Sequence, residues 1–298
     1  MVSERILANQ GGKLPELPEV ETVRRGLEKV LIGQKIKSIR LHWEGSFQGK
    51  HSLLYPGEVT ELRRRGKLLM IVFSHGWTLQ AHLRMTGQLI YVADGGEREG
   101  GGHPNDDLVR SLPAKHTRIT IQFQSKGKLY FNDQRKFGYL KMVPTEELHE
   151  ESFLKRLGPE PWDEIFNTDY LHTWFQRRAR TKIKPLLLDQ SVIAGLGNIY
   201  VDEALFLTGI LPTRPAGEVK KSELPPLIKN IQLVLERGIQ YGGVSAKDYV
   251  NAEGLKGTMQ EQLYVYGRKG ETCKKCETPI VWSKLSGRGT HTCPNCQK

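Results

Sequence analysis

The chain has 298 residues, 38% of them hydrophobic and 26% charged, a composition typical of a globular protein large enough for two domains. No apolar run is long enough to cross a membrane, and residues 1–14 lack the apolar core of a signal peptide, so a cytoplasmic protein is expected. The formal net charge of +11 favours a polyanionic partner, and nucleic acid is the first candidate.

The first half of the chain predicts one helix followed by a β-rich region. Pro18 is placed to begin the helix, apolar residues recur at helical spacing as far as Val30, and Gly33 ends it. Between residues 35 and 143, short β-like runs alternate with turn residues, which predicts a β-sandwich or barrel. Residues 94–115 are glycine-rich and charged, and they predict a long mobile surface loop.

The second half is predicted to be helical as far as a cysteine-rich end. Two short helices flank the sequence "AGLGN", with Asn198 capping the second helix and Gly209 ending it. A further helix is expected over residues 222–237. The fold class is therefore α+β, divided into a tail (1–14), a β-sandwich (15–146), a helical domain (147–265) and a ribbon (266–298).

All four cysteines lie near the C-terminal end, in two closely spaced pairs. Such pairs can supply the four thiolates of one tetrahedral Zn²⁺ site, and the residues between them resemble a β-hairpin, so a structural zinc ribbon is predicted. An iron centre or unligated thiols are the alternatives, and His291 is close enough in sequence to compete as a ligand. The candidate ligands are Cys273, Cys276, Cys293 and Cys296.

Basic residues mark two further candidate sites for phosphate. Five of the eight residues 177–184 are basic, and they precede "GLGN" at a helix N-terminus, where backbone N–H groups, Asn198 and Lys184 predict a phosphate cradle. Arg288 lies between Gly287 and Gly289 in the predicted hairpin turn, where a guanidinium can reach phosphates. The basic run alone, or Arg288 alone, is more typical of a solvated surface, whereas Lys184 and Asn198 together make a more specific case for phosphate binding.

Seven segments, taken in order, resemble one enzyme family. The segments "PELPEVETVRR", "HLRMTG", "DQRKFG", "LGPEP", "AGLGNIYVDEAL", "VYGRKGETC" and "RGTHTCPNCQK" are similar to those of bacterial formamidopyrimidine-DNA glycosylase. The sister family, endonuclease VIII, is expected to carry glycine where this chain has Leu17. The resemblance implies a β-sandwich, a helix–two-turn–helix domain and a zinc ribbon in a monomer that acts on nucleoid DNA.

The implied activity is removal of oxidised purines such as 8-oxoguanine and formamidopyrimidines, followed by strand cleavage through β,δ-elimination. The partner is duplex DNA with oxidised purines or abasic sites. The secondary amine of an N-terminal proline attacks C1′, displaces the base and forms a cationic Schiff base. A glycine-rich stretch over residues 244–258 matches the loop that closes over the flipped base.

The resemblance also assigns individual roles, several of which composition gives no reason to suspect. It implies Pro15 as nucleophile, Glu16 as acid, and Lys67 and Arg288 as phosphate-contacting residues of the catalytic site. It implies DNA contacts through Lys184, Asn198, Tyr200 and His82, and a trio that fills the vacancy left by the flipped base, Met85, Arg135 and Phe137.

Pro15 can act as the nucleophile only with a free amine, since the nitrogen of a mid-chain proline is an amide. Leu14 stands where the family has its initiator methionine, and one hypothesis is that residues 1–13 are an untranslated leader before a TTG start codon. Proteolysis after Leu14 is a second route. If the tail is retained, the alternative is a catalytically silent binder of damaged or abasic DNA. A zinc-ribbon RNA or ribosome factor fits the charge and the cysteines but leaves "PELPE" and "DQRKFG" unexplained.

Overall fold

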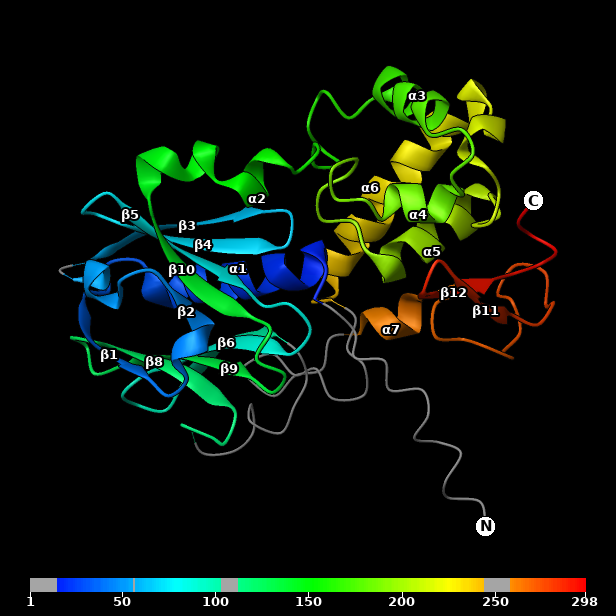
Figure 1. Ribbon diagram of the computed structural model, residues 1–298. Helices are drawn as coiled ribbons and strands as arrows, with labels where there is room; N and C mark the ends of the chain where they lie inside the picture. Colours follow the sequence, from blue (N-terminus) through cyan, green and yellow to red (C-terminus); the bar gives the residue numbers. More distant parts are fainter. Residues whose placement is uncertain (1–14, 56, 103–111, 244–257) are drawn as a thin grey trace, which may run out of the picture.

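The computed structural model describes residues 15–55, 57–102, 112–243 and 258–298. Figure 1 shows two bodies side by side: a β-sandwich from the first half of the chain, and a helical body that carries a small hairpin. The predicted α+β class is confirmed. Within the described ranges, no helix is long and apolar enough to span a membrane.

The sandwich consists of two five-stranded sheets, in the orders β1-β8-β9-β6-β7 and β2-β10-β5-β4-β3. Neighbouring strands are antiparallel except for β10 and β2. Apolar side chains from the facing sides of both sheets form one core. The strands are β1 (Ile36–Leu41), β2 (Phe47–Gln48), β3 (Val59–Arg65), β4 (Leu68–Phe73), β5 (Trp77–His82), β6 (Gly87–Val92), β7 (Arg98–Gly102), β8 (Thr117–Phe123), β9 (Lys128–Asp133) and β10 (Tyr139–Pro144).

The β-like runs of the sequence are confirmed as β1, β4, β5, β6, β8, β9 and β10, but β7 corrects the expectation of a structureless loop over residues 94–115. Strand β7 pairs with β6 along its whole length, and it has no apolar side chain to reveal it. Its glycines are needed for close approach: a Cβ on Gly100 would lie 2.1 Å from the carbonyl oxygen of Leu89. Residues 103–111 lie outside the described part of the loop.

Helix α1 (Leu17–Leu31) lies along the edge of the sandwich, where it packs against the edge strands β3 and β7. Val20 and Leu27 belong to the sandwich core, whereas Leu17 belongs to the core of the helical body. The one helix therefore joins both cores, and its N-terminus lies where the two bodies meet (Figure 1).

The helical body packs α3, α5 and α6 around a second apolar core. Gly209 ends α5 in the left-handed conformation, with φ of 79°, as predicted. Asn198 does not cap this helix: Gly197 is the N-cap, and Asn198 is the first helical residue. The helices are α2 (Ser152–Lys155), α3 (Thr168–Arg177), α4 (Ile183–Leu187), α5 (Asn198–Thr208), α6 (Leu224–Gln240) and α7 (Met259–Gln262).

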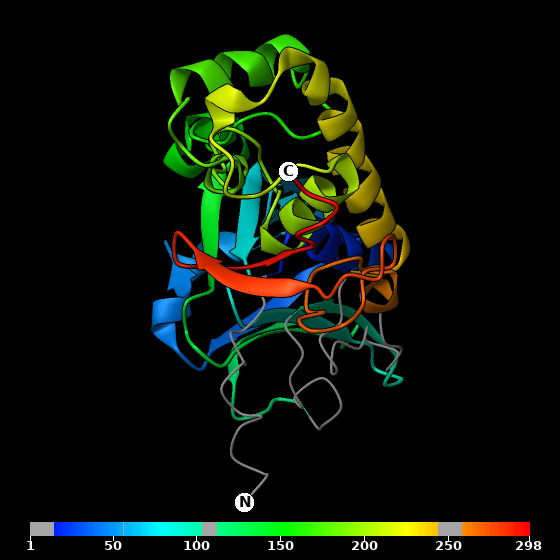
Figure 2. The ribbon, with the colours of Figure 1, turned by 90° about the vertical axis from the view of Figure 1, so that its right-hand side faces the viewer.

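The predicted hairpin is confirmed as β11 (Val281–Leu285) and β12 (Arg288–Thr292), with β12 against α5. Figure 2 shows the hairpin below the helices, on the side that faces the sheet of β1, β8, β9, β6 and β7. A small apolar core between the hairpin region and α5 contains Phe206 of α5, Val265 and Ile280.

A cluster of ion pairs joins the two bodies beside α1. Arg64 of β3 forms a bidentate pair with Glu160, at 2.6 and 2.8 Å, and its Nε lies 3.0 Å from Oε2 of Glu21 in α1. Burial alone would raise the pKa of Glu21, but hydrogen bonds from Arg24, Arg25 and Arg64 lower it to about 2. Glu21 is therefore ionised under ordinary conditions, and the cluster links α1 to the segment that leads into the helical body.

Candidate active site

Glu16 lies at the junction of α1 and α5 and is only 3% exposed. Its Oε1 accepts a hydrogen bond from the backbone N–H of Ile199, 3.1 Å away, in the first turn of α5. Gly197 makes this approach possible, since a Cβ there would lie 2.1 Å from the Glu16 carboxyl carbon. The helix N-terminus predicted to cradle a phosphate therefore holds the carboxyl group of Glu16, which corrects that prediction.

Burial raises the pKa of Glu16 from 4.5 to about 7, because a carboxylate is poorly solvated in the interior. The positive charge of Lys67 offsets only part of this effect. The second carboxyl oxygen, Oε2, has no hydrogen-bond partner among the described residues. At neutral pH the group is therefore about half protonated, and it can donate a proton to an atom placed beside it.

A second acid, Glu19, holds the backbone that follows Pro15. Its Oε2 accepts the N–H of Glu16 at 2.9 Å, and its Oε1 accepts the hydroxyl of Tyr200 at 2.8 Å. Tyr200 is 0% exposed and lies in the helical core. Its predicted contact with DNA phosphate is therefore corrected to an interior role in orienting Glu19.

Lys67 and Arg288 approach the same region from two other elements. The Nζ of Lys67, just before β4, donates to the carbonyl oxygen of Leu196 at 3.1 Å. Burial lowers the pKa of Lys67, the charge of Glu16 counteracts this, and nearby Arg288 lowers the pKa further. Arg288 is exposed at the start of β12, and Pro15 is buried directly before Glu16. The structure thus brings the four residues predicted for catalysis into one neighbourhood.

Lys184 lies in the interior, with 0% exposure. Its ammonium forms an ion pair with Asp202, 2.6 Å from Oδ1, and donates to the carbonyl oxygen of Gly289 and to Oγ1 of Thr290, each at 2.9 Å. With these three partners it is not available to a phosphate, so that prediction is corrected. Asn198 donates from Nδ2 to the same Gly289 carbonyl at 3.1 Å, and both side chains therefore position the hairpin turn.

Met85, Arg135 and Phe137, here called the wedge, gather at one end of the sandwich. Nη1 of Arg135 lies 3.1 Å from Sδ of Met85, and its guanidinium carbon lies 4.9 Å from the centroid of the Phe137 ring. Phe137 is 55% exposed. The structure therefore brings these three predicted residues together on the surface.

The carboxylate of Asp133 fixes both turns that carry the wedge. It is 0% exposed, and it accepts the N–H of Arg135 at 3.1 Å, the N–H of Gly138 at 2.6 Å and the hydroxyl of Thr86. Thr86 follows Met85 in the chain, so one acid orients residues from two loops. The sequence prediction missed this role, although Asp133 opens the motif "DQRKFG".

His82 lies beneath the turn that carries Met85, with 8% exposure. Its Nδ1 accepts the backbone N–H of Arg84 at 3.1 Å, and its ring packs against Tyr139 and Phe153. Burial, with a smaller contribution from Arg84, lowers the pKa of His82 to about 3. The ring is therefore neutral at physiological pH and supports the turn, and it offers no charge to DNA.

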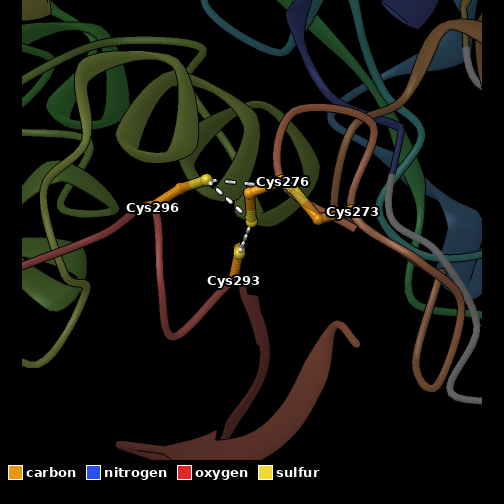
Figure 3. Close-up of side chains that lie close together, drawn as sticks. All are labelled: Cys273, Cys276, Cys293 and Cys296. Carbon is orange, nitrogen blue, oxygen red and sulfur yellow. Dashed lines mark hydrogen bonds between the residues drawn. The ribbon is translucent and has the colours of Figure 1, made fainter. Parts of the chain in front are cut away.

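The four cysteines converge beside the hairpin (Figure 3). All four Sγ atoms lie within 4.8 Å of one another, and individual pairs are 3.3, 3.4 and 3.9 Å apart. A tetrahedral ion with bonds of about 2.3 Å holds its sulfurs about 3.8 Å apart, so the cluster can bind one metal ion. His291 is not part of this cluster, and its Nδ1 lies 3.6 Å from Oδ2 of Asp202.

Two adjacent acids of α5 fasten the ribbon to the helical body, and the sequence prediction missed both. Glu203 accepts three consecutive backbone N–H groups, of residues 264–266, at 2.7 to 2.9 Å, and burial raises its pKa. Asp202 pairs with Lys184 and also accepts the N–H of His291 at 2.9 Å. The available signal was two consecutive acids within the apolar run "IYVDEALFL".

Two sequence predictions concern residues outside the described ranges. Of the stretch matched to a base-covering loop, residues 244–258, only Thr258 is described. The tail, residues 1–14, also lies outside them.

Comparison with known proteins places this geometry in a family. The formamidopyrimidine-DNA glycosylase N-terminal domain matches residues 14–140, and the formamidopyrimidine-DNA glycosylase H2TH domain matches residues 157–250. The formamidopyrimidine-DNA glycosylase of Desulfitobacterium hafniense is 42% identical over 289 residues, which cover 95% of this chain and 100% of the relative. The protein of that name from an Exiguobacterium species is 39% identical over 292 residues, 96% of this chain and 100% of the relative.

Solved structures agree with the sequence comparisons. A complex between Lactococcus lactis Fpg and DNA containing an abasic site superposes with a TM-score of 0.83 at 37% identity, covering 95% of this chain and 100% of that one. A complex of wild-type Lactococcus lactis Fpg with DNA containing an oxidised pyrimidine gives 0.82 at 37% identity, with the same coverage. The chain belongs to the formamidopyrimidine-DNA glycosylase family.

Proposed function

We propose that this protein is a base-excision repair enzyme that flips oxidised purines out of duplex DNA, removes them, and cuts the strand by β,δ-elimination. The substrates are 8-oxoguanine and formamidopyrimidines. The observation that carries the proposal is the buried carboxyl group of Glu16, with a pKa of about 7, directly beside Pro15. A carboxyl group with this pKa is suited to proton donation at neutral pH, next to a residue that becomes a secondary amine when N-terminal.

In the proposed reaction, the lone pair of the Pro15 nitrogen attacks C1′ of the damaged nucleotide while the bond from C1′ to the base breaks. The base leaves with the electron pair of that bond and takes up the proton that the Pro15 nitrogen loses. Glu16 donates its proton to the sugar ring oxygen, the ring opens, and the nitrogen and C1′ form an iminium. The iminium acidifies the C2′ proton, whose loss expels the 3′ phosphate; a second elimination expels the 5′ phosphate. Lys67 and Arg288 contribute positive charge beside these phosphates.

The wedge occupies the space vacated by the flipped nucleotide. Arg135 pairs with the orphaned cytosine, and Phe137 inserts beside it, which offsets part of the unstacking cost of a few kcal/mol. The exposed Arg288 and the partly exposed Asn198 bind backbone phosphates around the lesion. Division into a catalytic sandwich (15–146), a DNA-binding helical domain (147–265) and a ribbon (266–298) is part of this proposal.

The metal of the cysteine cluster is proposed to be one structural Zn²⁺. Four sulfur ligands complete a tetrahedral shell and leave no position for substrate. The ion would hold together the segments on either side of the hairpin, and thereby support the turn that carries Arg288.

The proposal requires the amine of Pro15 to be free, and borohydride trapping tests this directly. The chain beginning at Pro15, the 298-residue chain and a Pro15→Gly variant of the shorter chain are incubated with duplex DNA containing 8-oxoguanine opposite cytosine. We expect base release and a covalent adduct from the chain beginning at Pro15, impaired base release from the glycine variant, and no adduct from any chain that retains residues before Pro15. Tight binding by the shorter chain without base release or adduct would leave the silent binder as the function.

A further inference from the structure

Lys136 lies inside the wedge turn, between Arg135 and Phe137, yet its side chain points to another part of the sandwich. Its backbone is left-handed, with φ of 59°, a conformation uncommon for lysine. The carboxylate of Asp133 accepts the backbone N–H groups of Arg135 and Gly138, on either side of Lys136, and these hydrogen bonds hold the turn. The ammonium of Lys136 lies 3.7 Å from the centroid of the Trp43 ring.

Trp43 follows β1 and is 44% exposed, although it is a large aromatic residue. Its backbone N–H donates to the carbonyl oxygen of Arg118 at 3.1 Å, and Nε of Arg118 donates to the carbonyl oxygen of Asp133 at 2.7 Å. The backbone that carries the indole is therefore connected, through Arg118, to the same residue that fixes the wedge. Its position relative to Lys136 follows from the fold and not from nearness in sequence.

We propose that Lys136 binds a backbone phosphate of the undamaged DNA strand, and that Trp43 is a positioning residue that holds the Lys136 ammonium ready for it. This inference rests on the proposed function. The strand opposite the lesion must pass the wedge, because Arg135 and Phe137 replace the flipped nucleotide, and Lys136 lies between these two residues in the chain.

The Lys136 ammonium has an aromatic ring as its partner, and this is the observation that points to a phosphate ligand. A lysine held by a carboxylate is fixed in place but has its charge compensated, whereas an aromatic face attracts the ammonium and leaves its full charge available to an anion. Among the described residues, no carboxylate forms an ion pair with Lys136. Fixing this flexible side chain before DNA arrives reduces the entropy lost on binding.

The salt dependence of DNA binding tests the proposal. The probe is a duplex with a tetrahydrofuran abasic-site analogue opposite cytosine, and binding is measured on both the 298-residue chain and the chain beginning at Pro15. Loss of one phosphate contact in Lys136→Met should lower the slope of log K against log salt by about 0.9, and should weaken binding about five- to tenfold at 0.1 M salt. Lys136→Arg should restore the slope.

Lys126→Met is the matched control, because Lys126 is also exposed and left-handed, with φ of 68°, but lies at the far end of β9. It should leave the slope unchanged. Trp43→Ala should weaken binding about two- to threefold while Trp43→Phe retains most of the affinity, since a phenyl ring also attracts the ammonium. Methylphosphonate linkages opposite the lesion should weaken the wild-type protein but not Lys136→Met.

The outcomes separate this inference from the proposed function. If the wild-type protein prefers the abasic-site duplex but Lys136→Met has the wild-type slope, the phosphate contact is refuted and the repair function stands. If Trp43→Ala binds DNA as tightly as the wild type while Lys136→Met lowers the slope of log K against log salt by about 0.9, the positioning role of Trp43 is refuted. If neither wild-type chain prefers the abasic-site duplex, the proposed function fails and this inference fails with it.

Discussion

Replacement of Glu16 with glutamine should make the folded protein less sensitive to pH. In the wild-type chain, burial raises the pKa of Glu16 from 4.5 to about 7, so folding favours the protonated form. The stabilisation from that proton is fully present below about pH 4.5 and is lost as the pH rises through about 7. Glutamine is close in shape and cannot titrate, so Glu16→Gln should not show this loss.

The size of the effect follows from the difference between the two pKa values. At about 1.4 kcal/mol per pH unit, a rise from 4.5 to about 7 corresponds to about 3 kcal/mol. Solvent screening does not reduce this free energy appreciably, because the Glu16 side chain is almost completely buried. Between about pH 5 and about pH 8, the wild-type chain should lose about 3 kcal/mol of unfolding free energy relative to the variant.

Urea unfolding of the 298-residue chain at several pH values, followed by tryptophan fluorescence, gives the comparison. The other titrating groups are common to both proteins, so the contributions of those that do not respond to the charge of Glu16 cancel in the difference. Glu44→Gln, at an exposed glutamate, serves as the control and should track the wild type. Parallel curves for the wild type and Glu16→Gln across this range would show that Glu16 is not a carboxyl group of raised pKa, and would remove the basis for its role as an acid.

Three further predictions concern the ribbon and the wedge. Lys184→Met leaves the carboxylate of Asp202 buried without its cationic partner and should lower the unfolding free energy by about 3–5 kcal/mol in urea titrations. Adding Asp202→Leu should recover part of this loss, and a loss near zero in Lys184→Met would contradict the buried ion pair. Elemental analysis should find one zinc per chain, and a chelator should lower the melting temperature; a metal-free protein of unchanged stability would refute the zinc site. Phe137→Ala should leave stability within about 0.5 kcal/mol, because the ring is 55% exposed, while base excision in single-turnover assays falls at least about tenfold; an unchanged rate would show that Phe137 does not act as a wedge.

Much of the fold is encoded in local sequence patterns. The apolar spacing after Pro18 and the turn at Gly33 delimit α1, and alternating apolar runs delimit most strands, because both depend on neighbours in the chain. The metal site was predictable for the same reason, since two short cysteine spacings prepare two pairs of ligands. Strand β7 was not, because three of its five residues are glycines whose role is to allow close packing against β6.

The roles of individual polar residues were decided by the tertiary structure. Lys184 and Tyr200 belong to motifs that imply DNA contact, but their partners lie 105 and 181 positions away in the chain and hold both side chains in the interior. The N-terminus of α5 was predicted to bind phosphate, and it holds Glu16, 183 positions away. The sequence by itself determined which chemical groups are present and which elements carry them. Only the fold decided which groups are desolvated, and desolvation is what separates a buried acid such as Glu16 from an exposed cation such as Arg288.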